Sequence, residues 1–130
     1  MANEAICYIT PTRFSRVTVA DANALVKGTV MALTTPNTGA ASSADNDVPA
    51  GILMESKSAN DGVTEVTVAL DGEWGLLATA AGITVGNMVT IAGANTIKIY
   101  TTLDDEKGYV LGKILETTAG STVCRVRVNL

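Results

Sequence analysis

The sequence predicts an all-β protein, and three observations point to this class. Stretches that alternate apolar and polar residues recur along most of the chain with turn signals between them, as is typical of sandwiches and barrels. Hydrophobic residues make up 47% of the chain and aromatic residues only 4%, which favours a thin sheet core of Val, Ile, Leu and Ala. Two parts of the chain also read as near-copies of each other. The 130 residues suffice for one domain with a substantial core.

The duplication is clearest in two hairpin-like stretches, GILMESKSANDGVTEVTVAL (51–70) and GKILETTAGSTVCRVRVNL (112–130). Each opens with Gly and an apolar run, carries Glu before a hydroxyl residue, turns at a Gly and closes on V-x-V-x-L. Upstream, ADANALVKGTVMAL (20–33) matches ATAAGITVGNMVTI (78–91), again with the copies roughly 60 residues apart. Because a single hairpin is marginal in water, we expect the copies to pair into one closed or clipped β unit.

The remaining elements follow from local pattern. Apart from the two hairpins, we expect strands at 17–19, 28–35, 73–77, 86–91 and 96–100, and we expect the second hairpin to begin at 109. Pro36 ends the second of these strands because proline has no N–H for the ladder. The small polar stretch 37–48 predicts a loop, with 101–107 as its counterpart. We also expect turns at 71–72 and 93–95 and one helical turn within 78–82.

The first residues are apolar but have no sustained period. We therefore divide the chain into an N-terminal arm (1–19) that binds a partner and one β domain (20–130) with halves at 20–72 and 78–130. The alternative is that the arm pairs along an edge of its own sheet. The candidate contact residues of the arm are Ile6, Tyr8, Ile9, Arg13, Phe14 and Arg16. Trp74, the single tryptophan, is either part of the core or an anchor at an oligomer interface.

Composition excludes several functions. A net charge of −4 and the absence of a basic cluster argue against nucleic-acid binding, and no transmembrane run or secretory leader is visible. Without histidine the chain lacks the usual general base and the commonest metal ligand, and it has no phosphate-binding glycine motif. We expect Cys7 and Cys124 to be free thiols. We predict no enzyme activity, no small-molecule substrate and no cofactor.

Two weaker constellations carry alternatives. The pair of Ser and Lys within Ser56-Lys57-Ser58 suggests a nucleophile, but neighbours on a strand point to opposite faces, and a solvated strand end is the simpler interpretation. The acidic runs Asp45-Asn46-Asp47 and Asp104-Asp105-Glu106 offer oxygens for a calcium ion, although neither has EF-hand spacing.

The order of six motifs resembles the head decoration (capsid cement) proteins of tailed phages, of the lambda type, over residues 20–130. The motifs are G-T-V-M-A-L, P-A-G-I-L, V-T-V-A-L-D-G, A-x-A-A-G-I-T-V-G-N-M-V, G-x-V-L-G-K-I-L-E and V-R-V-N-L. The resemblance implies a small β-clip or β-tulip-like barrel that forms a homotrimer on the capsid exterior after synthesis in the host cytoplasm. It further implies that the arm lies against the major capsid protein and that the trimer stabilises the shell by bridging its subunits. The family brings no catalytic residues, and the arm matches none of its motifs.

A second function class remains open from the sequence. A carbohydrate- or receptor-binding β module displayed on a virion or cell surface would share the same composition. It differs in one expectation, because an exposed Trp74 would then contact the glycan or receptor.

Overall fold

The computed structural model describes residues 3–100 and 110–130, and all their regular structure is β, which confirms the predicted class. The strands are β1 (Ile6–Ile9), β2 (Phe14–Thr18), β3 (Val30–Thr35), β4 (Thr38–Ala41), β5 (Pro49–Leu53), β6 (Glu65–Ala69), β7 (Asp71–Ala78), β8 (Met88–Gly93), β9 (Thr96–Ile99), β10 (Val110–Ile114) and β11 (Val123–Asn129). The described part of the chain has no helix long and apolar enough to cross a membrane. The stretch 78–82, where one helical turn is expected, consists of the last residue of β7 and an irregular turn over 79–82.

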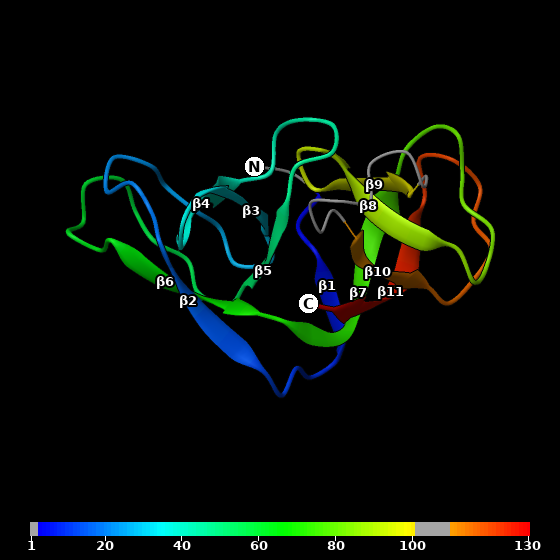
Figure 1. The fold of residues 1–130 in the computed structure, drawn as a ribbon, viewed down its shortest axis with the longest axis horizontal. Helices are drawn as coiled ribbons and strands as arrows, with labels where there is room; N and C mark the ends of the chain where they lie inside the picture. Colours follow the sequence, from blue (N-terminus) through cyan, green and yellow to red (C-terminus); the bar gives the residue numbers. More distant parts are fainter. Residues whose placement is uncertain (1–2, 101–109) are drawn as a thin grey trace.

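The strands form two small barrels that lie side by side (Figure 1). The first barrel closes in the order β2-β4-β3-β5-β6. The second runs β7-β11-β10-β8-β9, and a pairing of β7 with β9 completes the ring. β1 joins the second barrel at β7, and the chain crosses between the barrels at Leu70. Closure removes free sheet edges from both rings.

The two barrels repeat one topology strand for strand, so the pseudo-duplication predicted from the sequence is confirmed. The expectation that the two copies pair into one closed unit is wrong, because each copy closes into a barrel of its own. In each, the first strand pairs in parallel with the third, and every other pairing is antiparallel. Met31 faces Gly51 in the first barrel as Val89 faces Gly112 in the second, and a register shift follows each pair. The repeat therefore extends to the bulges.

One part of the sequence alignment is wrong. Val68 faces Leu53 in the first barrel, and Val126 faces the equivalent Ile114 in the second. Val126 thus corresponds to Val68, not to Val66 as the matching V-x-V-x-L endings predict. A pattern of period two matches itself equally well after a slip of two residues, so alternation alone cannot fix this register.

The stretch 37–48, expected to be a loop, contains strand β4. Its small residues fit a crowded place, because a Cβ on Gly39 would lie 3.0 Å from the Ala32 carbonyl oxygen and 3.3 Å from the Val17 side chain. Asn37, with φ of 53°, makes the tight turn that leads into it. Asp71 and Gly72, expected to form a separate turn, instead begin β7. The stretch 101–107 and Tyr109 lie outside the described residues.

The barrels share part of one core. The larger apolar cluster fills the second barrel around Trp74 and includes Val30, Ile52 and Ala69 of the first. A buried amide joins the barrels as well, since Asn95 Oδ1 accepts a hydrogen bond of 2.9 Å from the Val30 N–H. These shared contacts make the pair of barrels one packed unit.

The stretch predicted as an arm folds onto both barrels. β1 pairs with β7, which is the edge-pairing alternative. β2 lies between β4 and β6 and closes the first barrel, so this barrel begins at Phe14 rather than at residue 20. The physical reason is that Val17 and Val19 are core residues of the ring, at 3% and 4% exposed.

Candidate partner-binding face

Strand β1 presents apolar side chains to solvent. Ile6, Tyr8 and Ile9 are 53%, 46% and 51% exposed, and within the described residues β1 pairs with β7 alone. Exposed edge strands usually carry charge or proline, which block pairing with other chains. An apolar edge strand is therefore a candidate contact surface for a partner.

Tyr8 is held in place by the sheet beneath it. A Cβ on Gly75 would lie 2.9 Å from the tyrosine ring and 3.1 Å from Val123, so the absence of a side chain at this position lets the ring lie on the strand. The Arg125 guanidinium lies 4.3 Å from the centre of the ring. Cation–π contact and packing thus fix an exposed aromatic group before any partner arrives.

Two arginines of β11 continue this surface. Arg125 and Arg127 point outward at alternate positions, and Glu73 holds both, at 3.6 Å and 3.1 Å. Lys113 on β10 lies next to Arg127 in the register. Strict alternation on the last strand predicts the outward direction, but sequence reasoning did not single these residues out. We call the set Ile6, Tyr8, Ile9, Val123, Arg125 and Arg127 the arm face.

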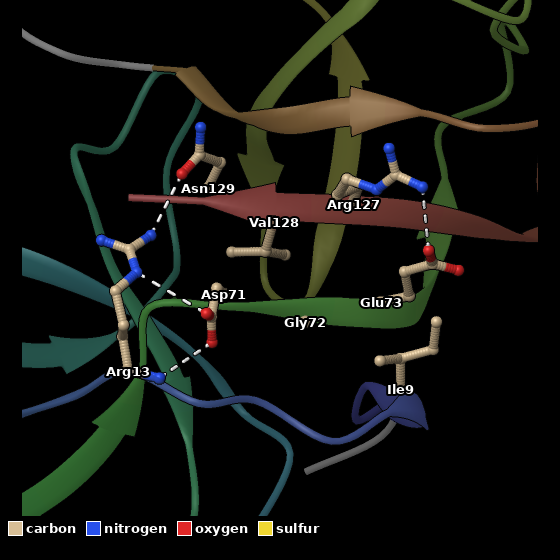
Figure 2. Close-up of a pocket in the computed structure, with 8 residues that line it drawn as sticks. All are labelled: Ile9, Arg13, Asp71, Gly72, Glu73, Arg127, Val128 and Asn129. Atoms are coloured by element: carbon tan, nitrogen blue, oxygen red, sulfur yellow. Dashed lines mark hydrogen bonds and ion pairs between the residues drawn. The ribbon is translucent and has the colours of Figure 1, made fainter.

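A groove of about 480 Å³ runs over the start of β7, between the N-terminal segment and the end of β11 (Figure 2). Arg13 spans it and donates hydrogen bonds to the Leu130 carbonyl oxygen at 2.9 Å and to Asn129 Oδ1 at 3.0 Å. Its Nε lies 3.6 Å from Asp71. We call Arg13, Asp71, Asn129 and Leu130 the clasp, because they tie the N-terminal segment, the crossing between the barrels and the end of β11 together.

Asp71 is the acceptor at the centre of the clasp. The backbone N–H of Arg13 donates to its carboxylate at 3.1 Å, and Thr12 donates through its hydroxyl at 2.7 Å and its N–H at 2.8 Å. These donors, led by the Arg13 N–H, together with the charge of Arg13, lower the pKa of Asp71 to about 2. The carboxylate is therefore ionised at neutral pH.

The predicted contact residues do not form one patch. Ile6, Tyr8 and Ile9 belong to the arm face, whereas Arg13 is bound to the chain itself in the clasp. Phe14, 49% exposed, and Arg16 lie on β2 of the first barrel. Arg16 donates to Thr67 Oγ1 at 3.0 Å on the neighbouring strand.

Trp74, the candidate anchor of an oligomer interface, is 2% exposed and belongs to the larger core cluster. Its indole N–H donates to the Asp71 carbonyl oxygen at 3.0 Å. The core interpretation therefore holds and the surface interpretation is corrected, because β7 points this position into the second barrel. The glycan-binding alternative loses the aromatic residue on which it depended.

Other sequence candidates have structural partners. The Lys57 ammonium is buried and donates to the carbonyl oxygens of Asp21, Asn23 and Ser58 at 2.9, 2.7 and 2.9 Å. Asp47 caps the turn before it by accepting from the backbone N–H groups of residues 43 and 44, and Asp45 pairs with Lys98. Asp104, Asp105 and Glu106 lie outside the described residues. Within 3–100 and 110–130 no three metal-ligating side chains gather at one place.

Both cysteines are free, as expected. Cys7 is exposed on β1, and Cys124 is 1% exposed in the second barrel. Burial, helped by the charge of Glu116, raises the pKa of the Cys124 thiol to about 11. Cys124 is therefore a protonated, small core residue.

Comparison with known proteins bears on the fold. No family model matches the chain, and no curated protein matches it. Among solved structures it is similar to the head fiber gp8.5 N base of bacteriophage phi29, with a TM-score of 0.54 and 15% sequence identity. The match covers 89% of this chain and 92% of that chain, so it includes both barrels. At this identity the likeness establishes a shared fold.

Proposed function

We propose that this chain is a structural protein of a phage head that binds the outside of the capsid through its arm face. The observation that carries the proposal is the likeness of the whole two-barrel chain to the base of a phage head fiber. The motif order of residues 20–130, which resembles capsid decoration proteins, points to the same setting.

The arm face is suited to such contact. Burying its apolar side chains against a partner contributes a favourable binding free energy of about 25 cal/mol per Å² of apolar area removed from water. Because β1 is already paired with β7, binding does not bear the full cost of ordering an extended arm. The arginines Arg125 and Arg127 favour an acidic partner surface, although the chain as a whole has a net charge of −4.

The finer proposal is that three copies assemble and bridge neighbouring subunits of the major capsid protein. A trimer would multiply a weak contact through effective concentration, and a rigid two-barrel unit would transmit load between the bridged subunits. Sedimentation velocity of the purified chain tests this part directly, with a trimer expected and a monomer at all concentrations contradicting it.

Co-sedimentation with empty, expanded heads of the same phage tests the binding. The variant Ile6→Ser/Tyr8→Ser/Ile9→Ser should fold and lose at least tenfold in affinity. A matched control changes three exposed valines outside the arm face, Val26→Ser/Val63→Ser/Val85→Ser, and should bind like the wild type. Equal binding by both variants would remove the arm face from the proposal, and no binding by the wild type would remove the capsid.

A further inference from the structure

The duplication exposes a vacancy in the first barrel. Ser15 on β2 faces Val68, and Trp74 on β7 faces Val126, so Ser15 occupies the position that Trp74 has in the second barrel. Each position lies two residues before a buried residue of its strand, Val17 or Leu76, and therefore points to the same face of the strand as that residue. Where the second barrel holds an indole ring, the first has a serine.

A pocket of about 310 Å³ lies at this place. Its walls include Ser15, Val17, Leu33, Ala50, Val68 and Leu70. This volume falls at the lower end of ordinary ligand pockets, and most of its walls are apolar.

The equivalent place in the second barrel is closed by larger side chains. Leu33 is 41% exposed at the pocket, whereas its counterpart Ile91 is fully buried. Ala50 corresponds to Leu111, which is also fully buried. The same backbone therefore packs tightly when an indole and a leucine are present and stays open when they are absent.

We propose that this pocket binds an aromatic side chain, tryptophan above all, presented by a partner protein. The second barrel shows what this backbone accommodates, because Trp74 is 2% exposed there among equivalent neighbours. The pocket opens to solvent, since two residues of its wall, Ser15 and Leu33, are exposed. A partner that covers them would bring a side chain to the opening. The inference does not depend on the partner being a capsid.

The test is a titration of the full chain with N-acetyl-L-tryptophanamide, in which methyl NMR detects binding. N-acetyl-L-leucinamide is the matched control compound. Saturable shifts at the methyls of Val17, Leu33, Val68 and Leu70, with a dissociation constant on the order of millimolar, are expected. The leucine compound should bind at least several-fold more weakly. Shifts spread over both barrels, or equal response to the two compounds, would overturn the proposal.

Two variants copy the second barrel into the first. Ser15→Trp should fill the pocket and reduce binding of the probe at least tenfold, and Ala50→Leu should do the same if the tryptophan overpacks the barrel. Ser58→Trp, which adds the same residue at an exposed position, is the control and should bind like the wild type. Unchanged binding by folded Ser15→Trp or Ala50→Leu protein would show that the probe binds elsewhere.

Discussion

At one end of each barrel a loop lies against the turn before the last strand, and the two barrels hold this contact in different ways. The backbone bridge is the same, Leu25 with Lys57 in the first barrel and Ile83 with Thr118 in the second. In the first barrel the loop is held through the Lys57 ammonium, which satisfies three backbone carbonyls from inside. In the second, Gly120 lets the backbones touch, since a Cβ there would overlap the Ala80 carbonyl.

The difference teaches which features the topology requires and which it leaves open. Backbone pairing, bulges and the glycines at close strand contacts recur in both barrels, because they set the path of the chain. The side chains inside the barrels differ. At one end the first barrel uses the Lys57 ammonium, where the second uses a backbone contact at Gly120. Ser15 of the first barrel occupies the position that Trp74 has in the second. Changes at these positions should therefore affect one barrel strongly and its counterpart weakly.

The largest effect should come from Trp74→Ser, which gives the second barrel the residue of the first. Removing a buried indole leaves a cavity and should lower the free energy of unfolding by about 4 kcal/mol, measured by chemical denaturation followed by circular dichroism. Ser15→Ala, at the equivalent position of the first barrel, should change it by less than about 0.5 kcal/mol. A stable Trp74→Ser protein that only loses self-association would instead restore Trp74 as an interface residue.

Lys57→Met should come next. The change removes the ammonium that donates to three backbone carbonyl oxygens. It should destabilise the chain by about 3 kcal/mol, because the oxygens of Asn23 and Ser58 lose this donor. The Asp21 oxygen keeps a hydrogen bond of 2.8 Å from the Asn60 N–H. Thr118→Val, at the equivalent position, removes only one exposed hydroxyl contact and should cost under about 1 kcal/mol. Equal effects of the two changes would show that the lysine does not support the loop.

Two glycines in the turns before the last strands, Gly62 in the first barrel and Gly120 in the second, give a smaller contrast, although they do not occupy equivalent positions. Gly120→Ala should cost about 2–3 kcal/mol because its Cβ meets the Ala80 backbone, which cannot move like a side chain. Gly62→Ala meets nothing within 4 Å and should cost about 1 kcal/mol, the strain of φ at +83°. Thermal unfolding of the two variants measures the difference, and a larger loss in Gly62→Ala would contradict the backbone contact.

Sequence reasoning reached the class, the two hairpins and the duplication because glycines and alternating valines leave a direct trace in the sequence. It missed β4, since the small residues of TGAA carry no strand signal. They suit this strand because a Cβ at Gly39 would crowd the carbonyl oxygen of Ala32 on β3. It also misaligned the last strands by two residues, for a pattern of period two cannot fix its own register.

The site was only partly predictable. Ile6, Tyr8 and Ile9 are exposed, and their apolar character in an irregular segment was the signal. The clasp was not visible, because Arg13 and Asp71 are brought together by the crossing of the chain between the barrels rather than by spacing. The vacancy at Ser15 could be recognised only after the structure had fixed which residues correspond.

The smallest effect should appear at the clasp, which ties the N-terminal segment to the ends of β7 and β11 and tests whether the barrels depend on their junction. The pKa of Asp71 is lowered to about 2 in the folded protein and lies near 4 in the unfolded chain. Its stabilising contribution is thus present above pH 4 and disappears as the pH falls towards 2. Asp71→Asn should be less stable than the wild type at pH 7, and the difference in melting temperature should shrink between pH 4 and pH 2. Glu65→Gln, at an exposed carboxylate of β6, is the control and should show no such convergence. If the Asp71→Asn deficit were the same at every pH, the clasp would act through the shape of the side chain and not through its charge.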